Sequence, residues 1–191
     1  MGLKDARSSY TYVNIKQGQL VVKVDNEVKT YRSIEGVIKK VEFVMEEFEG
    51  RKIEKAKFLI DDVGDWYILQ MRTDSGYFRG FVNSLRSSTN PKGLLEVIPN
   101  IKKVDGKNPQ TTCFVFQEGN ALKHYFTKDF NGDYPELEKK EIKGQIVYDN
   151  YNQIQYWKKW LNEVFNSTST SADITPTEVS DNEEIVDDLP F

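Results

Sequence analysis

The chain has 191 residues, of which 38% are hydrophobic, 13% aromatic and 29% charged, and its formal net charge is −4. This length fits one globular domain with additional chain and excludes a large multidomain machine. The aromatic content excludes a wholly disordered chain, and no apolar run reaches the roughly 18 residues that a membrane helix needs.

From Tyr10 to about Thr127 the chain reads as short strands that are rich in β-branched and aromatic residues and are separated by turn residues. The expected strands are 10–15, 19–24, 37–48, 53–60, 66–72, 77–85, 95–103, 112–117 and 121–127. Glycine, asparagine or aspartate stands in each intervening segment, as turns require. Strands at this spacing predict a mainly β fold, either a sandwich or a barrel.

Three of these strands place rings and basic side chains on the face opposite their apolar residues, because successive side chains of a strand point to opposite sides. The residues on these faces are Lys55, Lys57, Trp66, Arg72, Tyr77, Arg79 and Phe81. The alternative is that both sides of the strands are covered. In that case Trp66 and Phe81 belong to the core.

The spacing of apolar residues changes after residue 145. From Ile146 to Phe165 the apolar residues are spaced by three and four, which predicts an amphipathic helix over 146–165. Such a helix closes the open side of a β-barrel, or alternatively provides a surface for a partner or a second copy.

Charge divides the chain into two parts. From Asn166 to Phe191 there are seven Asp or Glu and no Lys or Arg. Residues 1–165 keep all 26 Lys and Arg and 23 of the 30 acidic residues, a net charge of +3. We therefore expect a folded domain over 1–165 and a disordered acidic tail over 166–191, which has too little apolar surface to fold.

The tail ends in two acids, an aliphatic residue, a proline and a terminal phenylalanine. These residues are Asp187, Asp188, Leu189, Pro190 and Phe191. A terminal ring and carboxylate can be bound by an apolar pocket with a basic residue beside it, and proline reduces the entropy lost on binding. The sequence therefore predicts a peptide that docks on a partner.

This tail resembles those of bacterial and phage single-stranded DNA-binding proteins, which are acidic and end in an Asp-rich, aliphatic-Pro-Phe tip. Leu189 stands where isoleucine is usual in that family, and Val186 where an acid is more common. The resemblance implies an OB-fold-like β-barrel that coats single-stranded DNA without sequence specificity. It also implies that the tip recruits proteins of DNA replication, recombination and repair.

Binding of single strands requires exposed rings for base stacking and basic side chains for phosphates. We expect Trp66, Tyr77 and Phe81 to stack on bases, and Lys55, Lys57, Arg72 and Arg79 to contact phosphates. Tyr125 with Lys123 forms a further candidate pair. A second interpretation is an adaptor domain that has no affinity for nucleic acid and uses the tail as a docking peptide. RNA binding is a third.

Catalytic and metal-binding motifs are absent from the sequence. The single Cys113 and single His124 cannot form an internal disulfide or a four-ligand zinc site. No phosphate-binding glycine loop or nucleophile elbow occurs. We therefore expect no enzyme activity, cofactor or metal, no membrane association and a cytoplasmic location. Oligomeric state is not determined by the sequence.

Overall fold

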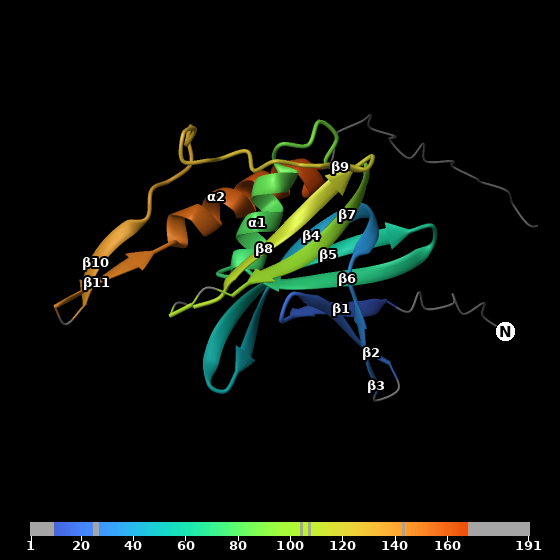
Figure 1. Cartoon of the computed structure of the whole chain (residues 1–191), viewed down its shortest axis with the longest axis horizontal. Coiled ribbons are helices and arrows are strands. Elements are labelled where there is room, and N and C mark those ends of the chain that lie inside the picture. The colour runs from blue at the N-terminus through green and yellow to red at the C-terminus, as the bar shows by residue number, and fades with distance from the viewer. Residues whose placement is uncertain (1–9, 25–26, 104, 107, 143, 168–191) are drawn as a thin grey trace, which may run out of the picture.

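The computed structural model describes residues 10–24, 27–103, 105–106, 108–142 and 144–167 (Figure 1). It is mainly β, as the sequence predicts, with two helices. The strands are β1 (Thr11–Lys16), β2 (Gln19–Val24), β3 (Glu27–Tyr31), β4 (Ile34–Phe48), β5 (Arg51–Asp62), β6 (Asp65–Arg72), β7 (Leu94–Lys102), β8 (Gln110–Gln117), β9 (Asn120–Ala121), β10 (Glu138–Ile142) and β11 (Gln145–Asp149). The helices are α1 (Gly76–Leu85) and α2 (Tyr151–Leu161), and a π-helical turn over Asn162–Asn166 follows α2.

Nine strands form one sheet in the order β3-β2-β1-β6-β5-β4-β7-β8-β9, and β10 and β11 form a separate hairpin that projects from the body (Figure 1). The sheet is not closed into a barrel, which corrects the barrel expectation. Its edge strands β3 and β9 do not pair with each other, and β6 pairs in parallel with β1, Val13 lying opposite Leu69.

The segment predicted as a strand over 77–85 is instead α1, and that prediction is wrong. Ser75 caps the helix by accepting a hydrogen bond from the backbone N–H of Phe78, at 3.2 Å. The buried residues Phe78, Phe81, Val82 and Leu85 follow the spacing of one helical face. Aromatic and β-branched residues favour strands in isolation, but here the capped helix buries more of them.

Helix α1 packs directly on the backbone of β8. A Cβ atom added at Gly76 would lie 2.3 Å from the Thr111 carbonyl oxygen, and one at Gly80 would lie 2.2 Å from the Thr112 Oγ1. Both distances are far below van der Waals contact, and the two glycines are four residues apart on one face of α1. The absence of side chains at these positions therefore sets how closely the helix approaches the strand.

The C-terminal helix is confirmed, although it begins later than the predicted range 146–165. Its first predicted residues form β11, and the regular α-helix starts at Tyr151. The predicted strand over 121–127 is also shorter than expected, because only Asn120–Ala121 pairs with β8. Strands β3, β10 and β11 were not predicted. Nearly all their residues are exposed, so they lack the apolar alternation of a buried strand.

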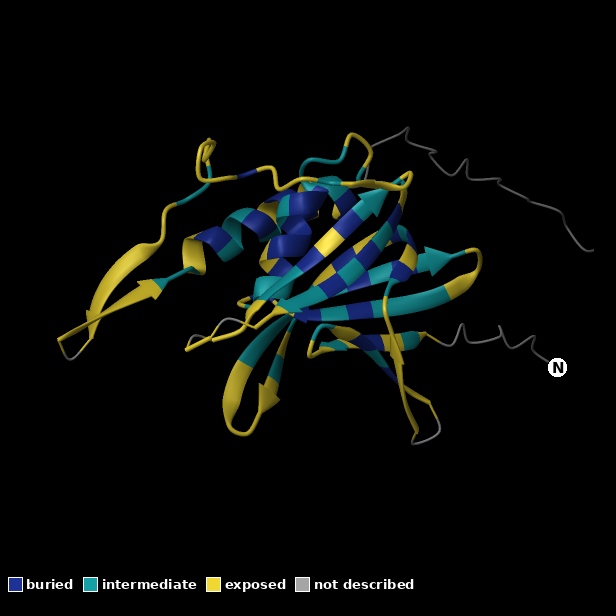
Figure 2. Ribbon diagram, in the orientation of Figure 1, coloured by how far each residue is buried: buried dark blue, intermediate teal, exposed yellow. Residues whose placement is uncertain are grey.

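The core lies between the inner side of the sheet and the two helices, where the buried faces of the strands and helices meet (Figure 2). Trp157 of α2 is 1% exposed and donates its indole N–H to the Tyr134 hydroxyl at 3.0 Å. Lys158 Nζ lies 2.5 Å from a carboxylate oxygen of Glu54 on β5. The first contact joins α2 to the segment after β9, and the second joins it to the sheet. Neither helix of the described ranges has the length and apolar character required to cross a bilayer.

Candidate nucleic-acid interface

The outward side of β1, β6, β5 and β4 carries exposed rings and lysines. The register aligns Tyr12 with Ile68, Ile68 with Leu59 and Leu59 with Lys40, which gives one row of side chains across the four strands. The neighbouring row contains Asn14, Gln70, Lys57 and Glu42. We call this surface the aromatic face, and define it by Tyr10, Tyr12, Lys40, Lys57, Leu59, Trp66 and Ile68.

The rings of the aromatic face are accessible. Tyr10 is 45% exposed and Tyr12 is 51% exposed, and Trp66 is half-buried. The ring of Tyr10 meets that of Trp66 edge-on, with centroids 6.4 Å apart. Tyr10 and Tyr12 line a hollow of about 250 Å³ whose floor includes Leu59 and Ile68. Exposed rings beside an apolar floor offer stacking surfaces that any base can use.

Most lysines of this surface are paired with acids. Lys55 Nζ lies 2.6 Å and Lys57 Nζ 3.1 Å from the carboxylate of Glu46, while Lys40 Nζ lies 2.7 Å from Glu42. Hydrogen bonds from Lys55 and then Lys57 stabilise the ionised form of Glu46 and lower its pKa below the ordinary value. The positive charge of the aromatic face is therefore largely neutralised within the protein.

Four of the predicted DNA-binding residues lie together on the outward side of β5 and β6. Lys55 is directly opposite Arg72 in the register, and Lys57 and Trp66 follow on the same side. Arg72 is exposed and its guanidinium donates two hydrogen bonds to Asp74, at 2.9 and 2.6 Å. This group thus extends the aromatic face along both strands, as alternation predicts.

Tyr77 and Phe81 differ from the prediction because they belong to a helix. Phe81 is 0% exposed and packs edge-on against Phe58 with centroids 4.9 Å apart, so its ring is not available for stacking. Tyr77 is half-buried and its hydroxyl accepts a hydrogen bond from the Gly18 backbone N–H at 2.8 Å. Burial raises the pKa of Tyr77. It lines a hollow beside Lys55 and Arg72, at the end of the aromatic face.

The other three predicted residues do not line the aromatic face. Arg79 is exposed on α1 and faces a separate groove. Tyr125 lies beside the C-terminal half of α1, where its backbone N–H donates to the Asn83 carbonyl and its ring centroid lies 5.3 Å from the Arg86 guanidinium. Lys123 is exposed, and its carbonyl accepts a hydrogen bond from Ser87.

Sequence reasoning missed Tyr10, Tyr12 and Lys40. The signal existed in part, because Tyr10 and Tyr12 alternate with Thr11 and Val13, and Val13 is 2% exposed. The missing fact was the parallel pairing of β1 with β6, which joins strands more than fifty residues apart in the chain. Pairing between such distant strands leaves no local sequence signal.

Metal or nucleophile chemistry has no evident site in the described residues. Within these ranges no three His, Cys, Asp or Glu side chains gather where they could hold a metal ion. Cys113 is fully buried, and burial raises the pKa of its thiol far above the ordinary value. The predicted partner-binding residues Asp187, Asp188, Leu189, Pro190 and Phe191 lie outside the described residues.

Comparison with known proteins identifies no relative. No family model matches the chain, and neither the curated proteins nor the solved structures contain a significant match.

Proposed function

We propose that this protein binds single-stranded DNA without sequence specificity and recruits replication, recombination or repair proteins through its C-terminal tip. The observation that carries the DNA-binding proposal is the aromatic face. Two tyrosines about half exposed, a tryptophan and two lysines lie together on one open side of the sheet. Rings with basic side chains between them are the arrangement that single-strand binding requires.

The position of the aromatic face supports an OB-like fold for part of the sheet. We assign β4 to β8 to the five strands of such a fold, with β4 pairing both β5 and β7. OB-folds are partly open barrels that bind oligonucleotides on the face of their second and third strands. In this assignment those strands are β5 and β6, which carry Lys57, Leu59, Trp66 and Ile68.

Recruitment through Phe191 is proposed from the sequence of the tail. The tip offers a terminal ring, a proline and a carboxylate, preceded by acids that are attracted to a basic rim. In this proposal the folded part holds DNA while the tip contacts a second protein, so the two activities can be separated by mutation.

Titration with oligo(dT) tests the DNA-binding proposal, because Trp66 is the tryptophan that a base can reach. Trp157 and Trp160 are 1% and 7% exposed. Stacking on Trp66 should quench its fluorescence, and Trp66→Phe should remove the quenching while DNA is still bound. We expect Tyr12→Ala to weaken binding by about 1 to 3 kcal/mol, the usual effect of removing one stacking ring.

The control for Tyr12→Ala is Tyr31→Ala on the edge strand β3. Tyr31 is 49% exposed and belongs to no part of the aromatic face. Its removal should leave DNA affinity unchanged. If neither fluorescence nor anisotropy of labelled oligo(dT) responds to the wild-type protein, the chain is an adaptor without DNA affinity. If oligo(U) competes as well as oligo(dT), RNA belongs among its ligands.

A further inference from the structure

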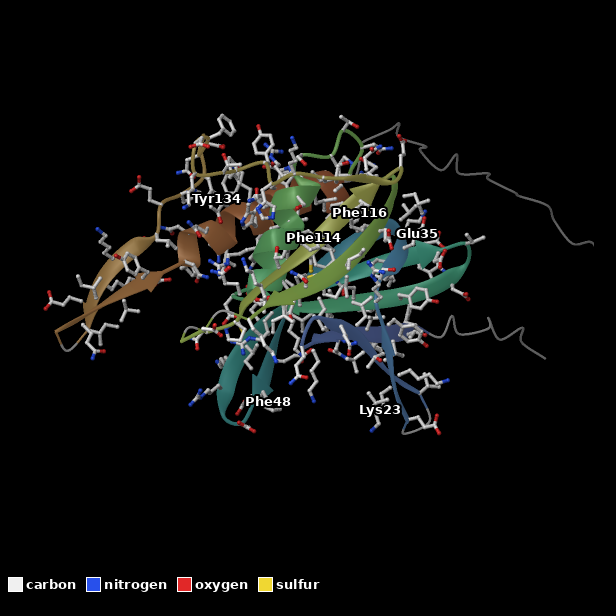
Figure 3. All side chains as sticks on the ribbon, viewed as in Figure 1. Lys23, Glu35, Phe48, Phe114, Phe116 and Tyr134 are labelled. Carbon is white, nitrogen blue, oxygen red and sulfur yellow. The ribbon has the colours of Figure 1, made fainter. Side chains whose placement is uncertain are left out.

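A second, larger groove lies on the part of the molecule formed by α1, β7 and β8. Its volume is about 900 Å³, and its lining shares no residue with the hollow of the aromatic face. Gly76, Arg79 and Asn83 of α1 form one wall, and the segment that follows β9 forms the other. Figure 3 labels Phe114 on β8 and Tyr134 on that segment. We call this hollow the basic groove.

The basic groove carries positive charge that no acidic side chain of the described residues neutralises. Arg79 on α1, Lys102 on β7 and Lys128 in the segment after β9 all line it, and all three are exposed. Its lining contains no aspartate or glutamate. Within the described ranges, none of the three makes an ion pair with an acidic side chain. This contrasts with Lys55 and Lys57 of β5, which share Glu46.

Three cations from separate elements repel one another unless an anion lies between them. The groove therefore favours a ligand with several negative charges spread along its length. A phosphodiester chain meets this requirement, since it presents one charge per nucleotide.

The remaining lining residues favour a nucleic acid over an acidic peptide. Phe114 projects from the outward side of β8 and is 49% exposed, although its neighbours Cys113 and Val115 are both fully buried. An exposed ring beside phosphate-binding cations can stack on a base. Asn100, Gln110 and Thr111 add neutral hydrogen-bonding groups along the same surface.

From these observations we propose that the basic groove binds the sugar–phosphate backbone of single-stranded DNA, as a second site apart from the aromatic face. The proposal rests on the DNA-binding function argued above. The two surfaces make different contacts with DNA. The aromatic face supplies most of the base stacking, and the basic groove supplies most of the phosphate contacts. A strand longer than one site then occupies both.

The test compares the full chain with its Lys102→Gln/Lys128→Gln variant, using oligo(dT) of about 8 and about 30 nucleotides, below and above the upper limit for one OB-type site. Each phosphate contact on a single strand contributes about −0.7 to the slope of log affinity against log salt. For the long oligonucleotide the variant should therefore have a slope shallower by about 1.4. Quenching of Trp66 at saturation should be unchanged.

The matched control is Lys139→Gln/Lys159→Gln, which removes two lysines that do not line the groove. Its slope should equal that of the wild type. As a second variant, Phe114→Ala should weaken binding of the long oligonucleotide by about 5- to 140-fold. Tyr31→Ala again serves as the ring control. Phe114 and Tyr31 are both exposed, so substitution of either ring should leave the core packing intact.

The outcomes separate this proposal from the function itself. If the wild-type chain binds neither oligonucleotide, the proposed function fails. If it binds and quenches Trp66 but the groove variant has the slope of its lysine control, the second site is overturned. Tighter DNA binding by the groove variant would also overturn it, because the groove would then hold an anionic segment of the protein in place of DNA.

Discussion

The side-chain amide of Asn166 forms two hydrogen bonds with the backbone of Val41. It donates to the Val41 carbonyl at 2.7 Å and accepts from the Val41 N–H at 3.3 Å, across 125 positions of sequence. The amide thus pairs with β4 as a neighbouring strand would. Asn166, the first residue assigned to the acidic tail, is therefore fixed to the sheet.

We expect Asn166→Ala to lower the free energy of unfolding by about 1 to 3 kcal/mol, because it leaves two partly buried backbone groups without partners. Chemical denaturation measures this change. Ser167→Ala is the control, since the hydroxyl of the adjacent serine makes only a 3.4 Å contact with the Asn162 carbonyl, and the substitution keeps the backbone hydrogen bond to that carbonyl. Equal stability of the two variants would show that the pairing with β4 contributes little.

Glu46→Gln should increase affinity for single-stranded DNA. Glu46 neutralises Lys55 and Lys57, and its removal leaves both lysines free to contact phosphates. The slope of log affinity against log salt should become steeper by up to about 1.4. Glu47→Gln is the matched control, because Glu47 is exposed and points to the other side of the strand. An unchanged slope would place DNA elsewhere on the molecule.

The same carboxylate gives stability a pH dependence. Its pKa is lowered from the ordinary 4.5 in the folded state, mainly by the hydrogen bond from Lys55. A lowered pKa means that the stabilisation is present above pH 4.5 and is lost as pH falls through the folded-state value. Glu46→Gln lacks this contribution. Thermal unfolding from neutral to acidic pH should therefore show a smaller loss of stability for the variant than for the wild type.

Gly80→Ala should destabilise the protein despite the preference of helices for alanine. That preference is worth about 1 kcal/mol, whereas overpacking against β8 costs about 1 to 3 kcal/mol. The added Cβ would lie 2.2 Å from Thr112 Oγ1 and 3.0 Å from the Cys113 backbone nitrogen. Arg79→Ala, on the exposed side of the same helix, is the control for stability. A stabilised Gly80→Ala protein would mean that α1 can move away from β8.

Deletion of residues 168–191 should tighten DNA binding at low salt and abolish partner recruitment. This segment carries seven acidic and no basic residues, so it competes with DNA for basic surfaces at high effective concentration. The deletion is best started after Ser167, because Asn166 holds β4. Phe191→Ala is the control variant: it should lose partner binding while retaining the DNA affinity of the full chain. Equal affinity of the deleted and full chains at low salt would exclude competition.

Local patterns predicted much of the sheet and part of the candidate site. Alternation correctly placed Lys57 and Trp66 on the outward side of β5 and β6. It failed over 77–85, because the aromatic residues there favour a strand although Phe78 and Leu85 have the spacing of one helical face. The cap at Ser75 was the local signal that could have identified the helix.

The basic groove was beyond prediction from sequence for a different reason. Arg79, Lys102 and Lys128 come from a helix, a strand and a connecting segment, and only the fold brings them to one hollow. The sequence shows where lysines occur along the chain. It does not indicate which of them lie beside an acidic side chain in the folded protein. Glu46 is an example, because it reaches Lys55 and Lys57 only across the β4–β5 pairing.

The close contact of α1 with β8 at Gly76 and Gly80 limits how far the basic groove can change shape when a ligand binds. Both elements line the same hollow, and they lie so close that a Cβ atom at Gly76 or Gly80 would come within 2.3 or 2.2 Å of an atom of β8. Neither can slide toward the other when the hollow is filled. The part of the basic groove formed by α1 and β8 is therefore preorganised, so little binding free energy is lost in immobilising it.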